Sequence, residues 1–154
     1  MNADPEAMPR LSLADIRAAR AQLGNRVLTT PVQQLSGPAV EAAFAANKII
    51  AAVCHGPAGL VTAKRPDGKS ILFEKKINCF TDEEESAANL TDVVPFKLET
   101  RMRELGGKFE KAPNWQEFAV RDGQLITGQN PSSSALVAQH VLAALNNAKA
   151  DLAA

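Results

Sequence analysis

The stretch "KIIAAVCHGPAGL", residues 48–60, constrains the fold more than any other part of this chain. Its apolar run is short, partly β-branched and followed by small, turn-forming residues, which favours a buried strand of a parallel sheet. The glycine and proline that follow predict a helix that continues to about Ala63. Cys54 and His55 are therefore expected at a sharp turn from a strand into a helix.

Strands alternate with helices along most of the chain, which indicates the α/β class. Further strands are predicted in "SILF" (70–73), in "KINCF" (76–80) and in a hairpin formed by 117–120 and 124–127. Helices are predicted over 38–47, over 82–89, over about 95–105, and from Pro131 onward with Asn130 as the cap. The last helix is expected to bury a stripe of five apolar residues, Leu136, Val137, Val141, Ala144 and Leu145.

The composition excludes several classes of protein. The 154 residues fit one domain of ordinary size, and 17 basic residues balance 17 acidic ones, so no broad nucleic-acid footprint is expected. Because no apolar run approaches the roughly 18 residues of a membrane span, we expect no membrane association and a cytoplasmic location. Cys54 and Cys79 are then expected to be free thiols, because that compartment is reducing.

The position of Cys54 predicts chemistry. A side chain at this kind of turn lies at the carboxyl edge of the sheet, where open α/β folds bind their ligands. The unpaired N–H groups of the following helix would lower the pKa of the thiol, so Cys54 is a candidate nucleophile. The alternative is a buried structural cysteine followed by a surface histidine. No metal is expected, because Cys54, His55, Cys79 and His140 lack zinc-like spacing, and His140 is expected to be an ordinary packed histidine.

Four motifs, "AAVCHGPAGLV", "FTDEEE", "LTDVVPFKLE" and "GGKFEKAPNWQEFAVRDGQLITGQNPSSS", closely resemble the ThiJ/PfpI family, in its glyoxalase III and stress-chaperone branch. The resemblance covers about residues 39–146 and implies a truncated flavodoxin-like three-layer sandwich with a mainly parallel sheet. It makes Cys54 the nucleophile and His55 its acid–base partner. Such enzymes convert methylglyoxal to lactate through a hemithioacetal, without metal or glutathione. The resemblance therefore implies a small aldehyde or acyl substrate and no cofactor.

A third site residue comes from "FTDEEE". This motif matches the stretch from which the same branch offers a carboxylate to the histidine, and Glu85 fits that spacing best. Such a carboxylate would orient the imidazole and favour its charged form. In the alternative interpretation, the acidic run only complements a helix start capped by Thr81.

Two polar pairs in the last motif are also of interest. "APNWQ" contains Asn114 and Trp115, which could line a pocket or fill a turn. "TGQNP" contains Gln129 and Asn130, which could approach the active site or cap the last helix. We favour the structural role for both pairs.

The sequence before Cys54 departs from the family. Residues 11–32, "LSLADIRAARAQLGNRVLTTPV", resemble the opening of pyridoxal-phosphate-dependent threonine dehydratases. The lysine motif that binds that cofactor is absent, so pyridoxal phosphate is not expected. The prediction is a hybrid chain, with a leader over 1–38 that contains one helix and a truncated ThiJ/PfpI-like domain over 39–150. The family's glutamate partner of the thiol and its glycine-rich oxyanion turn are not found before Cys54.

Two consequences are expected from this departure. Strands missing from the sheet would leave an apolar edge exposed, which predicts a homo-oligomer. The leading function is a cysteine-dependent enzyme of glyoxalase or deglycase type, weakened by the missing groups. The first alternative is a non-enzymatic, chaperone-like or oligomer-forming scaffold. The second is an amidotransferase or peptidase-like hydrolase, for which no separate amide-binding element can be identified.

Overall fold

The computed structural model describes residues 37–152, together with Ala14 and Ala18. The chain divides into two units, Met1–Gln34 and Leu35–Ala154, and only the second is described below. The helix predicted at 12–23 and the threonine dehydratase-like stretch 11–32 lie almost entirely outside the described residues.

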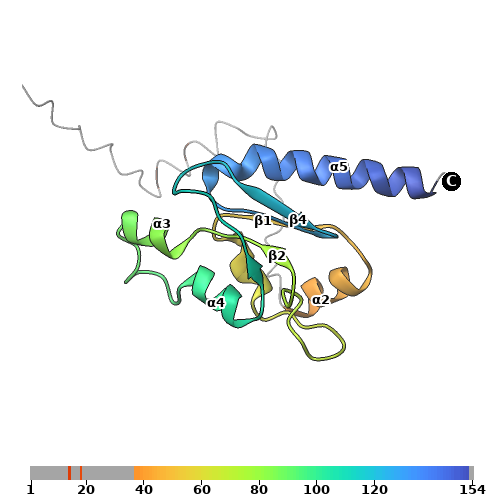
Figure 1. The fold of residues 1–154 in the computed structure, drawn as a ribbon, viewed down its shortest axis with the longest axis horizontal. Coiled ribbons are helices and arrows are strands. Elements are labelled where there is room, and N and C mark those ends of the chain that lie inside the picture. Colours follow the sequence, from red (N-terminus) through yellow and green to blue (C-terminus); the bar gives the residue numbers. More distant parts are fainter. Residues whose placement is uncertain (1–13, 15–17, 19–36, 153–154) are drawn as a thin grey trace, which may run out of the picture. The chain divides into compact units, whose positions relative to one another are not determined.

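A small mixed sheet forms the centre of the domain (Figure 1). Its strands follow the order β1-β5-β4, with β1 parallel to β5 and β4 antiparallel to it. A second, parallel pair joins β2 to β3. The strands are β1 (Ile50–Val53), β2 (Lys76–Ile77), β3 (Lys108–Phe109), β4 (Ala119–Asp122) and β5 (Leu125–Gly128). Two of the three pairings are parallel, which confirms the predicted α/β class with a mainly parallel sheet.

Helices cover both faces of this sheet. The helical segments are α2 (Gly37–Ala45), η2 (Gly56–Leu60), α3 (Asp82–Ala87), α4 (Leu98–Glu104), η3 (Pro131–Ser133) and α5 (Ser134–Leu152), where η marks a 3-10 helix. Figure 1 shows α5 along one side of the sheet and α2, α3 and α4 on the other. The predicted three-layer arrangement is confirmed.

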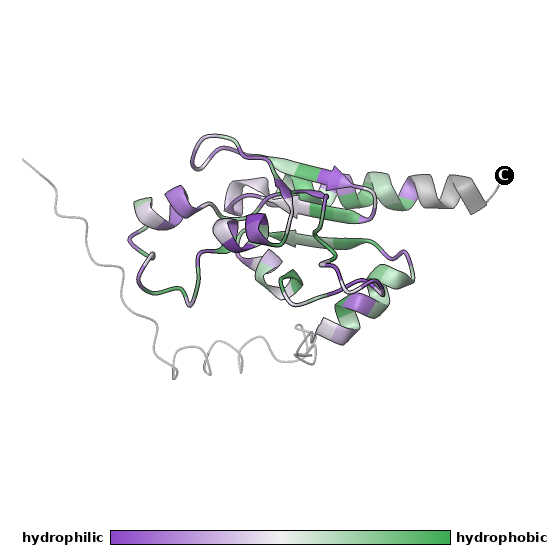
Figure 2. Ribbon diagram, turned by 60° about the horizontal axis from the view of Figure 1, so that its bottom comes forward, coloured by the Kyte–Doolittle hydropathy of each residue, from purple (hydrophilic) through white to green (hydrophobic). Residues whose placement is uncertain are grey.

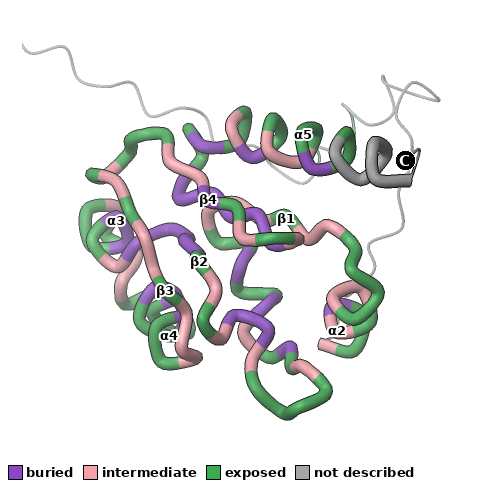
Figure 3. Tube along the Cα trace, turned by 45° about the vertical axis from the view of Figure 1, so that its right-hand side comes forward, coloured by how far each residue is buried: buried purple, intermediate pink, exposed green. Residues whose placement is uncertain are grey.

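Strand β5, whose four residues are all buried, lies between two apolar clusters of the core. Successive side chains of a strand point to opposite faces. Leu125 accordingly packs in a cluster with Ile77 and Met102 on the α4 face, whereas Ile126 packs with Val137 of α5. Hydrophobic residues follow the central strands in Figure 2, and in Figure 3 the buried residues of α5 lie on its sheet side. The strand thus holds two apolar clusters together.

The predicted strand "SILF" is wrong. Ser70 forms one isolated bridge with Lys64, and a turn follows. The N–H of Phe73 donates to the carbonyl of Ser70 at 3.1 Å, which closes the chain on itself. Ile71 and Leu72 are both fully buried within this turn. Their burial in the core therefore does not require a strand.

Three other predicted elements are shorter or shifted. "KINCF" forms a strand only at Lys76–Ile77. The N–H of Asn78 donates to the side-chain oxygen of Thr127 at 2.8 Å instead of to a carbonyl of a neighbouring strand. The segment after Cys54 is the five-residue 3-10 helix η2, so the predicted helix to Ala63 is wrong. The hairpin is confirmed but lies one or two residues further along, with Gly123 (φ 62°) in its two-residue turn.

The last helix forms as predicted, but its buried stripe is narrower than expected. Asn130 caps η3, Pro131 is its first residue, and α5 continues from there. Of the five predicted residues, Val137 and Ala144 are buried, and Leu136 and Val141 are half-buried. Leu145 is 45% exposed although it follows the buried Ala144, so the predicted burial of Leu145 is wrong.

We predict that Gly128→Ala destabilises the domain. A Cβ at this position would lie 2.5 Å from a methyl group of Val137 and 3.0 Å from one of Val53. Overpacking of this kind costs about 1 to 3 kcal/mol of unfolding free energy, measurable by urea denaturation. Gly59→Ala is the matched control, because its Cβ would meet nothing within 4 Å. Equal stability of the two variants would contradict the packing described here.

Candidate active site

Cys54 directly follows β1 and has a φ of 60°, in the left-handed region that side chains other than glycine rarely adopt. Two backbone hydrogen bonds hold it there. Its N–H donates to the carbonyl of Gly128 and its carbonyl accepts from the N–H of Phe80, both at 2.9 Å. Strain maintained by the surrounding structure is typical of functional sites. The predicted strand-to-helix turn is confirmed at the carboxyl end of β1.

The three predicted site residues contact one another in series. The thiol Sγ of Cys54 is 3.2 Å from Nδ1 of His55, and Nε2 of His55 contacts Oε1 of Glu85. A carboxylate only accepts, so we assign the imidazole proton to Nε2, which leaves Nδ1 free to accept the thiol proton. The His55 side chain is 44% exposed and that of Glu85 is 2% exposed. A buried carboxylate therefore orients an accessible imidazole toward the thiol.

The pKa of the Cys54 thiol differs from the sequence-based expectation. Burial raises it, and the charges of Glu84 and Glu85 raise it further, against a lowering by the His55 backbone. The predicted net lowering of the pKa is wrong, because burial and the two carboxylates outweigh the lowering by the His55 backbone at the start of η2. The geometry therefore presents a neutral thiol beside a base, which is one of the two ways to activate a nucleophile.

Both interpretations of the acidic run have structural support. Thr81 caps α3: its Oγ1 accepts from the N–H of Glu84, and the Glu84 carboxylate accepts from the N–H of Thr81. This reciprocal pair is a capping box. The same short helix directs Glu85 toward His55. One helix start thus serves the cap and the site together.

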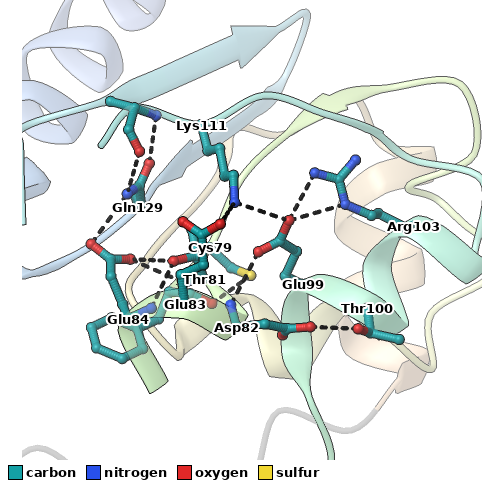
Figure 4. Close-up of polar contacts among 12 residues, drawn as sticks. Cys79, Thr81, Asp82, Glu83, Glu84, Glu99, Thr100, Arg103, Lys111 and Gln129 are labelled. Atoms are coloured by element: carbon teal, nitrogen blue, oxygen red, sulfur yellow. Dashed lines mark hydrogen bonds and ion pairs between the residues drawn. The ribbon is translucent and has the colours of Figure 1, made fainter. Parts of the chain in front are cut away.

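Glu84 is the functional residue that sequence reasoning missed. It is fully buried, and its Oε1 accepts from the N–H of Trp115 (2.8 Å), Nε2 of Gln129 (3.1 Å) and Nδ2 of Asn130 (2.8 Å). Figure 4 shows Gln129 and Thr81 on its two sides. Burial alone would raise the pKa of Glu84, but these hydrogen bonds and those of Thr81 outweigh it and lower the pKa. The spacing of Thr81 and Glu84, three residues apart before a helix, was the available signal.

A second buried carboxylate fixes α3 to α4. Oε2 of Glu99 accepts from the N–H of Asp82 at 3.0 Å, and its Oε1 accepts from Nη2 of Arg103 at 2.8 Å. Lys111 lies 3.9 Å from the same oxygen and pairs with Glu83 at 3.1 Å (Figure 4). A six-residue helix has few hydrogen bonds of its own, so the hydrogen bond from Asp82 to the buried Glu99 helps to hold α3, which carries Glu85, in place.

The remaining named residues have different positions. Gln129 and Asn130 are fully buried around Glu84, which agrees with the structural role favoured for them. Asn114 lies half-buried in a turn, while the Trp115 side chain is exposed. His140 lies half-buried on α5 and belongs to no group of potential metal ligands among the described residues.

The second cysteine is chemically quiet. Cys79 is fully buried, its Sγ donates to the carbonyl of Phe80 at 3.1 Å, and burial strongly raises the pKa of its thiol. Both cysteines are free, as predicted. In the part of the chain that the structure describes, no three His, Cys, Asp or Glu side chains form a potential metal site. No described helix is long and apolar enough to cross a membrane.

A strained cysteine at a sheet edge, beside a histidine that contacts a buried glutamate, is the arrangement that a cysteine nucleophile on an α/β fold requires. No family model matches the chain. A glutathione-independent glyoxalase of Schizosaccharomyces pombe is 32% identical over 104 residues, which are 62% of this chain and 43% of the relative. One from Saccharomyces cerevisiae is 34% identical over 113 residues, 68% of this chain and 46% of the relative.

Solved structures agree with these relatives. Glyoxalase III of Candida albicans superposes with a TM-score of 0.65 at 29% identity, covering 70% of this chain and 48% of that one. The 24 kDa rapid encystment protein of Francisella tularensis gives 0.69 at 38% identity, covering 71% and 48%. These matches confirm the flavodoxin-like fold and the resemblance of about two thirds of this chain to the ThiJ/PfpI family. The chain spans about half the length of the relatives it matches.

We predict that Cys54 of the folded protein is alkylated more slowly at neutral pH than a cysteine in a short unstructured peptide. Its raised pKa leaves a smaller thiolate fraction at every pH below that value, and only the thiolate reacts fast. The rate should therefore rise with pH through a midpoint above that of the peptide. Site-resolved mass spectrometry of iodoacetamide-treated protein measures this rate.

Cys79 is the internal control for this experiment, because its burial should prevent labelling until the protein unfolds. A Cys54 rate that is high and flat down to about pH 6 would show a depressed pKa and contradict the neutral thiol.

Proposed function

We propose that this domain is a cysteine-dependent, glutathione-independent glyoxalase that acts on small reactive aldehydes such as methylglyoxal. The observation that carries the proposal is the alignment of Cys54, His55 and Glu85. The names of the relatives support the same reaction. The raised pKa keeps the Cys54 thiol neutral at rest, and the His55 imidazole beside it can take its proton when it adds to an aldehyde.

In the first step, Nδ1 of His55 takes the thiol proton while Sγ of Cys54 bonds to the aldehyde carbon. The imidazole returns that proton to the former carbonyl oxygen, giving a hemithioacetal. Glu85 stabilises the imidazolium that exists between these two transfers, because its carboxylate bonds to Nε2. The thiol is thus activated only when it reacts.

In the second step, neutral His55 removes the hydrogen of the former aldehyde carbon as a proton, and the adjacent carbonyl takes up the electron pair to give an enediolate. His55 delivers this proton to the neighbouring carbon, and the hydroxyl proton of the hemithioacetal passes to the neighbouring oxygen, so that the former aldehyde carbon becomes the thioester carbonyl. The product is a lactoyl thioester on Cys54. One water then hydrolyses this thioester to lactate and frees the thiol. Methylglyoxal plus water gives lactate, so no oxidant, metal or external thiol is required.

We expect the rate of the proposed glyoxalase reaction to be low. Among the described residues, His55 is the hydrogen-bond partner of the Cys54 thiol, and no carboxylate contacts Sγ directly. The printed sequence also contains no "GGHG"-like turn to complete an oxyanion hole. Loss of one oxyanion donor costs roughly a hundredfold to a thousandfold in rate.

We predict that Cys54→Ser abolishes methylglyoxal turnover and that Glu85→Gln lowers kcat by about a hundredfold or more, because the imidazole loses its charge partner. Lactate formation measures both. Glu83→Gln is the matched control on the same helix, since its side chain is 66% exposed and pairs only with surface Lys111. Undiminished turnover in Cys54→Ser would rule out the proposed chemistry.

A second candidate function is an oligomer-forming or chaperone-like scaffold. Within the described residues, β1 pairs on one side only, with β5. Beside its open edge lies an apolar cavity of about 280 Å³. It is lined by α2, β1 and η2, including Val40, Ile50, Ala51 and Leu60. An open strand edge beside apolar surface favours pairing with another chain, so we propose that the domain forms a homo-oligomer through this edge.

We predict that the protein self-associates at micromolar concentration and that Ala51→Lys weakens this, because an edge lysine opposes strand pairing. Ala51 is exposed on β1, so the change should leave the fold intact. Light scattering over a concentration series measures the assembly, and Cys54→Ala should assemble like the wild type. A monomer at every concentration would exclude this candidate.

A further inference from the structure

Trp115 combines two unfavourable features. Its backbone has a φ of 66°, a left-handed conformation that costs about 1 to 3 kcal/mol for a residue other than glycine. Its side chain is nevertheless 48% exposed, so the strain is not repaid by burial of the indole. A strained backbone that presents an exposed aromatic ring needs an explanation beyond packing.

The loop that carries Trp115 is fixed at three successive points. Ala112 is bound through both its N–H and its carbonyl by the Gln129 side chain, at 2.9 and 3.2 Å. The N–H of Trp115 donates to Glu84 at 2.8 Å, and the carbonyl of Gln116 accepts from Asn130 at 2.8 Å. The three binding side chains are fully buried. The backbone from which the indole projects is therefore held by buried polar side chains.

This ring lies beside the site. The Phe80 ring is 4.6 Å from the imidazole of His55 and 5.6 Å from the indole of Trp115, centroid to centroid. Phe80 itself is 4% exposed, and its N–H holds the carbonyl of Cys54. The rings of His55, Phe80 and Trp115 therefore pack in sequence, and the indole at the end of this series is 48% exposed.

We propose that Trp115, backed by Phe80, forms an aromatic subsite that binds the substituent of the aldehyde and selects α-oxoaldehydes with an aromatic substituent over methylglyoxal. This inference rests on the proposed function. Aromatic rings pair in offset or edge-to-face arrangements that stabilise beyond area burial, which the exposed indole can offer.

A neutral ring fits this subsite better than a cation. The nearby carboxylates of Glu84 and Glu85 are both buried; Glu84 accepts several hydrogen bonds, and Oε1 of Glu85 contacts Nε2 of His55. A cationic substituent would find no accessible charge partner in them. The exposed indole of Trp115, which packs against the buried Phe80 ring, remains as the recognition surface.

The kinetic test compares kcat/KM for phenylglyoxal and methylglyoxal in the wild type, Trp115→Gly and Trp115→Phe. Glycine accepts the left-handed backbone, so the first variant removes the ring without adding strain. We expect the wild type to prefer phenylglyoxal by about threefold to tenfold. Trp115→Gly should lose that preference because kcat/KM falls more for phenylglyoxal than for methylglyoxal, and Trp115→Phe should restore part of it.

The control is Leu142→Ala, which shortens another exposed apolar side chain, 61% exposed on α5, and should keep the preference. Equal losses for the two aldehydes in Trp115→Gly would indicate a purely structural role and overturn the subsite. No preference in the wild type would overturn it as well.

A binding measurement separates this inference from the proposed function. Trp115 is the one tryptophan of the chain, so its fluorescence reports on this position alone. In Cys54→Ser protein we expect 2-hydroxyacetophenone to perturb this fluorescence at concentrations about threefold to tenfold lower than hydroxyacetone does. That result with no aldehyde turnover in the wild type would reject the glyoxalase and retain the subsite. Equal responses to the two hydroxyketones would reject the subsite.

Discussion

The buried carboxylate of Glu84 is the interaction on which the rest of the site depends. It accepts five hydrogen bonds from three separate segments: from Thr81 before α3, from Trp115 in the loop after β3, and from Gln129 and Asn130 after β5. An ionised group inside a protein is stable only when it is bonded in this way. Each donor segment is consequently fixed relative to α3, and α3 carries Glu85.

Activation of the thiol follows from this arrangement. Because α3 is fixed, Glu85 meets Nε2 of His55, and His55 presents Nδ1 to Cys54. The sheet holds Cys54 in a strained turn through Gly128 and Phe80. The buried carboxylates that orient the base also raise the pKa of the thiol, so the same groups favour a neutral resting state and a base ready to accept its proton.

The sequence predicted the parts of the fold that depend on local pattern. The apolar run before Cys54, the capped acidic helix and the hairpin all formed, because periodicity and turn chemistry decide them. "SILF" failed because tertiary packing buried Ile71 and Leu72 in a turn. The raised pKa of the Cys54 thiol could not be predicted, since it depends on burial of the thiol and, to a smaller extent, on Glu84 and Glu85, about thirty residues away in sequence. Motif resemblance placed Glu85 beside His55, but only the fold revealed Glu84 as the common anchor.

The most direct measurement is the unfolding free energy of the wild type and Glu84→Gln between pH 7 and 3. The pKa of Glu84 is lowered in the folded protein from its ordinary 4.5, so its stabilisation is present above that pH and lost as the pH falls through the folded pKa. The variant should be less stable by about 1.5 to 3 kcal/mol at pH 7. The gap should narrow below pH 4.5, whereas Glu83→Gln should match the wild type throughout. A gap of the same size at pH 7 and pH 3 would contradict an anchoring role for the Glu84 charge.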